Sequence, residues 1–287
     1  MKRYVSTAVI AAAFFVGISL LLYPVISEYI NAKHQSKAIA SYDEIASHMS
    51  EADYDEIFAE AQAYNDALAR TEGAFYQPER VPGYLEALDI TGTGIMGYVT
   101  IDKIGVELPV YHTVETDVLQ SAVGHLPGTS LPIGGEGTHA VLSGHRGLPS
   151  ARLFTDLNKL EPGDLFTITV LNRVVMYRVD QVKIVDPTDV TDLQLVPGRD
   201  YCTLFTCTPY GINSHRLLVR GVRVETPEDA APRYIANEAY RIDPLIVTPA
   251  VAAPMLLGIV VVMLIKSRRS ALKQKLRREG LLVREKQ

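Results

Sequence analysis

The sequence predicts a mainly β domain of barrel or sandwich type, with helices before it and a membrane-spanning helix on either side. Three observations support this: seven short β-like runs between residues 95 and 226, two long uncharged apolar runs, and an uneven distribution of charge. With 287 residues the chain can form one sizeable core with accessory segments. Its hydrophobic content of 47% excludes a wholly disordered protein.

Each apolar run, residues 4–26 and 245–265, is long enough to cross a hydrocarbon core of about 30 Å as a helix. A cleaved signal peptide is the alternative for the first run, but a signal core has roughly 7 to 15 residues, which is shorter than this run. In the second run Pro249 and Pro254 disfavour a soluble helix, whereas a membrane helix tolerates them. We therefore expect two transmembrane helices.

Charge predicts the orientation of these helices. Residues 1–3 contain two basic residues, and the tail 266–287 contains nine Lys or Arg against two Glu. The remaining 17 basic and 31 acidic residues give the part between them a net charge of −14, although the whole chain carries −5. Because basic flanks stay inside the cell, we expect both termini to be cytoplasmic and the acidic body to be extracellular. Nothing in this pattern indicates a nucleic-acid partner.

Two segments separate the first apolar run from the β region. Residues 28–70 are predicted to form a helical spacer, because apolar side chains recur there at helical spacing: Tyr54, Ile57, Phe58, Ala61, Tyr64 and Leu68. We expect this face to pack on the main domain. Residues 71–94 contain several Pro and Gly breakers, which predict a lid-like loop long enough to cover something.

The β region occupies residues 95–226, and residues 227–244 then form an extracellular linker. The predicted strands are Met96–Ile101, Val106–Tyr111, His139–Leu142, Leu165–Leu171, Val174–Val185, Tyr201–Thr206 and Arg216–Val224. Leu119–Val123 and Arg152–Leu157 are predicted as helical turns. Turn signals such as Leu126-Pro-Gly128 and Glu161-Pro-Gly-Asp164 separate the runs.

The chain has two cysteines, Cys202 and Cys207, which point to opposite faces if they share a strand. They are poorly placed to form a disulfide, so each is either inert packing or a reactive thiol. If the strands around Thr208–His215 pair as a hairpin, Cys207 falls opposite Arg216. An arginine beside a thiol favours the nucleophilic thiolate and can also stabilise an oxyanion.

A cysteine nucleophile also needs an imidazole, and the sequence has seven histidines. His34 and His48 lie in the spacer, while His112, His125 and His139 suit structural or surface roles. His215 would point to the face opposite Arg216. His145 ends an apolar strand in a Gly-flanked turn, which makes it the best partner on local grounds, but those grounds leave the choice open.

Two motifs resemble those of the sortases, and specifically the class C, pilus-assembling sortases. They are Thr203-Leu-Phe-Thr-Cys207 with Arg216 nine residues on, and Ser143-Gly-His145-Arg-Gly-Leu-Pro149. The resemblance covers residues 95–224. It implies a closed eight-stranded barrel and a catalytic triad of His145, Cys207 and Arg216.

The resemblance also implies an activity. A membrane-anchored cysteine transpeptidase on a Gram-positive-type cell surface would cleave LPxTG-like sorting signals through a thioacyl intermediate. The acyl group would pass to an amine, a pilin lysine first and a cell-wall precursor second. No cofactor and no metal are expected, because the histidines and carboxylates show no ligand spacing.

One feature departs from the family pattern. Class C sortases carry an Asp-Pro-aromatic motif in a lid over the cysteine, whereas this chain has Gln77-Pro78-Glu79, preceded by Phe75 and Tyr76. Phe75 or Tyr76 could act as the plug, or the cleft could be open. Two other function classes remain: a cysteine peptidase that releases product to water, and a non-catalytic membrane-anchored scaffold.

Overall fold

The computed structural model describes residues 2–227 and the single residues 266, 269 and 276. The predicted second membrane helix, residues 245–265, lies outside the described residues, as do most of the predicted linker and tail. Helix α1 and the β domain belong to one compact unit.

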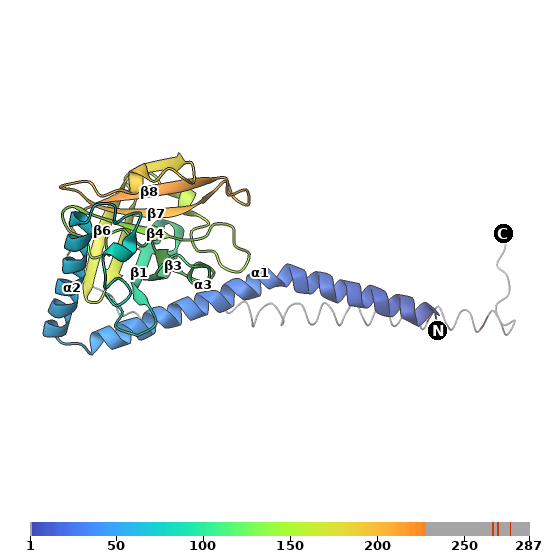
Figure 1. The fold of residues 1–287 in the computed structure, drawn as a ribbon. Coiled ribbons are helices and arrows are strands. Elements are labelled where there is room, and N and C mark those ends of the chain that lie inside the picture. The colour runs from blue at the N-terminus through green and yellow to red at the C-terminus, as the bar shows by residue number, and fades with distance from the viewer. Residues whose placement is uncertain (1, 228–265, 267–268, 270–275, 277–287) are drawn as a thin grey trace. The chain divides into compact units, whose positions relative to one another are not determined.

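The β domain is a closed barrel of eight strands in the order β1-β2-β3-β4-β7-β8-β6-β5 (Figure 1). The strands are β1 Ile95–Ile101, β2 Val106–His112, β3 Val123–His125, β4 Thr138–Ser143, β5 Leu165–Val170, β6 Arg173–Val185, β7 Asp200–Thr208 and β8 His215–Arg223. Neighbouring strands pair antiparallel except β2 with β3 and β4 with β7, which pair parallel. The mainly β prediction and the closed eight-stranded barrel are confirmed.

One local prediction is wrong. The segment Leu119–Val123 was expected to be a helical turn, but the short helix α3 ends at Leu119, and Val123 begins strand β3. Strand β3 closes the barrel between β2 and β4. The second predicted turn contains no regular helix before the 3-10 turn Leu157–Lys159.

Helix α1 runs without interruption over Lys2–Ser47, so the predicted boundary near residue 27 is not a break in the helix. Its apolar part is long enough to cross a membrane by length and composition, within a candidate span Ala13–Ser47. The last turns dock on the barrel, where the Tyr42 hydroxyl donates to the Met96 carbonyl (3.1 Å) and accepts from the Leu171 amide (2.9 Å).

Helix α2, Glu51–Arg70, begins with a capping box in which Ser50 and Asp53 bond each other's backbone amides. Its buried face consists of Tyr54, Phe58, Ala61, Tyr64, Asn65 and Leu68, which is the predicted face with Asn65 added. The Asn65 amide holds Leu131, donating to its carbonyl (3.2 Å) and accepting from its amide (2.7 Å). The helix therefore packs on the barrel, as the spacing predicts.

The strand ends define two ends of the barrel. At the first, which we call the thiol end, β4 ends at Ser143, β6 at Val185 and β7 at Thr208, and β8 begins at His215. At the second, which we call the closed end, β7 begins at Asp200 and β8 ends at Arg223. Every candidate of the predicted triad lies at the thiol end.

Candidate active site

Strands β7 and β8 place Cys207 directly opposite Arg216, which is the predicted register. Both side chains are half-buried. The Nη1 group of Arg216 donates to the carbonyls of Asn213 and His215, each at 3.1 Å. Within the described residues, the other donors of this guanidinium have no partner. Arg216 is thus held by its own loop, with donors left for a substrate.

Strands β4 and β7 bring His145 to the same place. They pair parallel with Ser143 beside Phe205, and the contact continues for one more residue. The Gly144 amide donates to the Phe205 carbonyl (3.1 Å), and the Thr206 hydroxyl donates to the Gly144 carbonyl (2.6 Å). Because the same parallel register carries on by one step, His145 falls beside Cys207.

The His145 imidazole is half-buried, and this burial lowers its pKa from the usual value. Its backbone carbonyl accepts from the Phe154 amide (3.1 Å), which folds the following loop back on itself. Within the described part of the chain, neither the imidazole nor the Cys207 thiol forms a hydrogen bond. A neutral imidazole with free nitrogens beside a thiol can take and return a proton.

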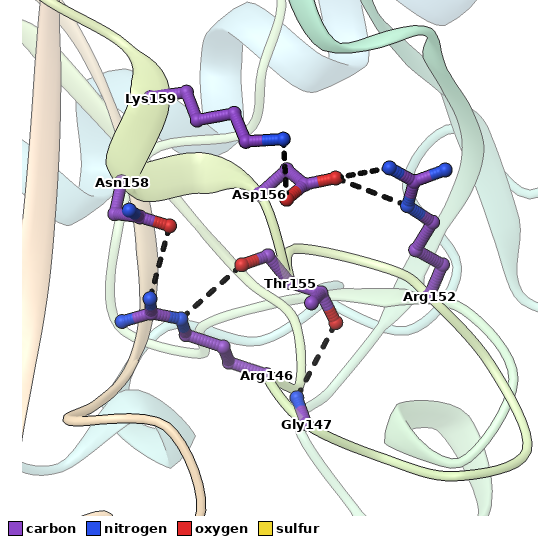
Figure 2. Close-up of polar contacts among 7 residues, drawn as sticks. All are labelled: Arg146, Gly147, Arg152, Thr155, Asp156, Asn158 and Lys159. Carbon is purple, nitrogen blue, oxygen red and sulfur yellow. Dashed lines mark hydrogen bonds and ion pairs between the residues drawn. The ribbon is translucent and has the colours of Figure 1, made fainter.

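Arg146, the neighbour of His145, connects the loop that contains His145, which we call the histidine loop, to strand β7. Its Nη1 donates to the Thr208 hydroxyl (2.9 Å), next to Cys207. Nε donates to the Thr155 carbonyl (3.2 Å) and Nη2 to the Asn158 side chain (2.9 Å), as Figure 2 shows. The Gly147 amide completes this cluster by donating to the Thr155 hydroxyl (3.3 Å). The Arg146 guanidinium therefore links the histidine loop to Thr208, the residue that follows Cys207.

Comparisons with known proteins agree with this geometry. Residues 99–224 match the model of the sortase domain. The solved sortase C1 of Streptococcus agalactiae is 48% identical over 67% of this chain and 100% of its own, with a TM-score of 0.61. This chain belongs to the sortase family. The sortase C of Streptococcus pneumoniae, studied for catalysis and pilin substrate specificity, is 43% identical over 66% of this chain and 97% of its own, with a TM-score of 0.60.

Class C enzymes are among the structural neighbours of this sortase. Among curated relatives, sortase D of Bacillus subtilis is 31% identical over 45% of this chain and 63% of its own length. Sortase SrtE1 of Streptomyces coelicolor is 29% identical over 58% of this chain and 49% of its own length. The chain thus spans about half to two thirds of the curated relatives that it matches. Sortases are cysteine transpeptidases.

In this sortase an apolar floor extends from Cys207 along the outside of the barrel. Phe205 lies two residues before Cys207 and pairs with Leu218, so both share the face of Cys207 and Arg216. Val141 and Leu218 are buried there with Val185 and Leu193. This cluster forms the floor of the surface next to the thiol.

The loop after α2 lies on this floor. Phe75 is half-buried and packs against the cluster, whereas Tyr76 is 70% exposed. A Cβ atom added to Gly128 would lie 2.7 Å from the Phe75 carbonyl oxygen, so the two backbones touch. Beneath the loop is a cavity of about 200 Å³, lined in part by Phe75, Thr129, His139 and Gln194. Gln77 is exposed, and Pro78 begins the 3-10 turn Pro78–Arg80.

The other histidines of the barrel have structural contacts. Both nitrogens of His112 face carbonyls, of Gly94 and Ala87, each at 2.9 Å. His125 is fully buried, with one nitrogen 2.7 Å from the Ser130 carbonyl and the other 3.0 Å from the Tyr84 hydroxyl. Burial lowers the pKa of His125 to about 4.

Sequence reasoning missed two features of the site. The first is the role of Arg146, whose hydrogen bond to Thr208 joins residues 62 positions apart in the chain. The second is the apolar floor. The sequence does contain a signal for it, because the predicted hairpin register that sets Cys207 against Arg216 also sets Phe205 against Leu218 on the same face. His145, Cys207 and Arg216, by contrast, were all named, and the strand register brings the three to one end of the barrel.

Proposed function

We propose that this sortase cleaves LPxTG-like sorting signals and transfers the acyl group to an amine, in the manner of a class C, pilus-assembling enzyme. The observation that supports the proposal is the pairing of Cys207 with Arg216 across β7 and β8, at the end of the barrel where β4 leads into His145. The preferred acceptor is a pilin lysine, because a similar enzyme from Streptococcus pneumoniae is described through its pilin specificity. A cell-wall precursor amine is the second acceptor.

In the first step the Cys207 thiol gives its proton to His145, and the resulting thiolate attacks the carbonyl carbon of the Thr before the scissile bond. The C–N bond breaks, the leaving amine takes a proton from His145, and a thioester remains on the sulfur. In the second step an acceptor amine attacks the thioester and loses its proton to His145. A new amide forms, and the thiolate is released. The reaction uses protein groups alone and needs no cofactor or metal.

Arg216 stabilises the negative charge that develops on the carbonyl oxygen in both steps. Its free guanidinium donors lie opposite Cys207, on the side where the tetrahedral oxygen forms. The half-buried setting strengthens these charge-assisted hydrogen bonds relative to bulk water. The same donors can orient the peptide before attack.

The enzyme is proposed to sit in the membrane with two spans, residues 4–26 and 245–265, and with both termini in the cytoplasm. Support for the first span comes from the apolar part of α1. The basic residues at both ends and the acidic body support the orientation. The barrel then lies outside the cell, where surface proteins and amine acceptors meet.

Residues 71–94 are proposed to act as a lid, with Phe75 as its plug. Phe75 packs on the floor cluster, whereas Tyr76 is exposed to solvent. The lid therefore blocks the peptide groove rather than the sulfur. Replacing Phe75 with Ala should raise kcat/KM for a sorting-signal peptide, whereas Tyr76→Ala should change it little. Equal effects of the two variants would refute the plug.

The proposed function is tested with a Cys207→Ala variant of the full chain, a sorting-signal substrate and an added amine. Mass analysis should show an amide-linked product with the wild type and none with the variant. Undiminished crosslinking by Cys207→Ala would overturn the mechanism. A wild-type product released to water even with amine in excess would make the enzyme a peptidase.

A further inference from the structure

The thiol end of the barrel faces the side from which α1 arrives. Going from the apolar part of α1 toward the barrel, the Asn31 amide donates first to the Ser150 carbonyl (2.7 Å). Gln35 donates next to the Ser121 carbonyl (2.6 Å), two residues before β3 begins. Tyr42 then reaches Met96 near the start of β1, at the closed end. Figure 1 shows α1 passing α3 and β3 along this path.

The distance from the apolar run to the first of these contacts is short. Glu28 is the first charged residue after Arg3, and Asn31 follows it by three residues. At 1.5 Å per helical residue this separation is about 4.5 Å. The headgroup layer on each side of a bilayer is roughly 5 to 7 Å thick. Ser150, in the loop that begins with His145, therefore lies at headgroup depth if α1 is the membrane anchor.

A second loop at this end exposes large apolar side chains. Tyr210 is 60% exposed and Ile212 is 73% exposed, both in the turn between β7 and β8. The Tyr210 ring rests on the histidine loop, since a Cβ atom added to Gly147 would lie 3.1 Å from it. Aromatic and aliphatic residues beside basic ones are typical of the membrane interface.

Charge in the loop after β4 is opposite to that of the body, whereas the loop after β6 at the same end carries Asp186, Asp189 and Asp192. Between residues 144 and 159, Arg146, Arg152 and Lys159 stand against the single acid Asp156, which pairs with Arg152 and Lys159 (Figure 2). The segment has a net charge of +2 within a region whose net charge is −14. Basic residues near an anionic bilayer are attracted to it, so the charge of this loop favours contact with such a surface.

We propose that the loops 144–156 and 209–214 rest on the outer membrane surface, with Tyr210 and Ile212 among the lipid headgroups. This inference rests on the membrane anchoring that is part of the proposed function. Cys207 then works within the layer next to the bilayer, and its substrates are peptides held at that surface. The bound surface is an anionic lipid bilayer rather than a protein.

The chain lacks tryptophan, so a single introduced Trp reports on one position. The probe is Ile212→Trp in the full chain, reconstituted in vesicles of phosphatidylglycerol and phosphatidylcholine. The matched control is Val196→Trp, which is also exposed and lies near the start of β7 at the closed end. Both variants share the same anchor, so a difference between them comes from the barrel's orientation.

Brominated lipids should quench Ile212→Trp emission strongly and shift it to the blue, and leave Val196→Trp nearly unchanged. Equal quenching of both variants would overturn the proposal. So would an Ile212→Trp emission that responds to a sorting-signal peptide but not to lipid, because the loop would then be a peptide-binding surface. This readout needs no catalysis, so it stands even if the proposed activity fails.

A second measurement uses activity. Ile212→Ser should lower turnover of a peptide tethered to the vesicles and leave turnover of the same peptide free in solution unchanged. An equal loss with both substrates would place Ile212 in the peptide groove and contradict membrane contact. Absence of turnover in the wild type would instead count against the proposed function.

Discussion

Strand β7 carries both thiols of the chain, and its two halves place them in environments that differ in burial. Cys202, toward the closed end, is fully buried, and burial raises its pKa well above the usual value. Cys207, at the thiol end, is half-buried beside His145 and opposite Arg216. One strand thus keeps the Cys202 sulfur protonated and inaccessible and leaves the Cys207 sulfur partly exposed. Reactivity is decided by position along the strand and not by residue type.

Two histidines, at the start and after the end of β4, show the same difference. His139, at the start of β4, has one nitrogen 2.9 Å from the Gln194 carbonyl and the other 2.8 Å from the Thr203 hydroxyl. His145, after the end of β4, has no hydrogen bond from its ring within the described residues. A side chain whose partners are all present stabilises the fold, whereas one with free nitrogens is available for chemistry.

The largest expected effect is the difference in alkylation rate between the two thiols. In the folded protein Cys207 should react readily with iodoacetamide, whereas Cys202 reacts only after the barrel opens. Since global opening costs about 5 to 15 kcal/mol, the rates should differ by about a thousandfold or more. Peptide mapping after timed labelling measures both sites at once. Comparable labelling rates of Cys202 and Cys207 in the folded state would contradict the proposed difference in accessibility between the two halves of β7.

The two histidines can be compared by the same substitution. His145→Asn should lower kcat by about 10²- to 10⁴-fold, because it removes the proton carrier, with little change in thermal stability. His139→Asn should keep most of the activity and destabilise the fold by about 1 to 3 kcal/mol, since it disturbs two buried hydrogen bonds. Steady-state kinetics and thermal melting distinguish the two. The reverse pattern would mean that the proton carrier has been misassigned.

Arg146 should have a smaller effect, because it positions the site without touching the substrate. Arg146→Gln removes the bond to Thr208 and lets the His145 loop move relative to Cys207, so kcat should fall roughly 10- to 100-fold. Arg152→Gln is the control, since its partner Asp156 keeps Lys159. A positioning role also predicts an altered pH profile of kcat/KM for Arg146→Gln. A profile identical to the wild type, with reduced melting temperature alone, would make Arg146 purely structural.

Several elements could be predicted because their signals are local. The register of Cys207 with Arg216 follows from a short loop between two β-like runs, and the buried face of α2 follows from helical spacing. Strand β3 escaped prediction because three residues, Val123-Gly-His125, give no alternation to detect. Helix α1 continues past residue 27 because the polar residues there, rich in Ala, Lys and Glu, still favour a helix.

The features that escaped prediction depend on tertiary contacts. Phe75 and Tyr76 are adjacent aromatic residues that the sequence does not distinguish as a plug, and only the packing of Phe75 on the floor cluster separates them. Local reasoning made His145 the best candidate but left the choice open, and the resemblance to sortases selected it. The bond from Arg146 to Thr208 needs β4 and β7 side by side, which spacing along the chain does not reveal.

The buried His125 yields the last prediction, a dependence of the free energy of unfolding on pH. His125 has a pKa of about 4 in the folded state because burial disfavours its charged form, whereas an unfolded histidine has about 6.5. As the pH falls, the unfolded state binds the proton first. The stability that neutral His125 supports is therefore complete above pH 6.5 and is lost progressively toward pH 4. The loss is about 3 kcal/mol at most.

His125→Gln keeps a donor for the Ser130 carbonyl and removes the titration. Its melting temperature should fall less steeply between pH 6.5 and 4 than that of the wild type, even if the variant is less stable at pH 7. His215→Gln is the control, because His215 is exposed and contacts Asp186 at the surface. If the wild type and His125→Gln lose stability equally over this pH range, protonation of His125 is not the cause of the loss.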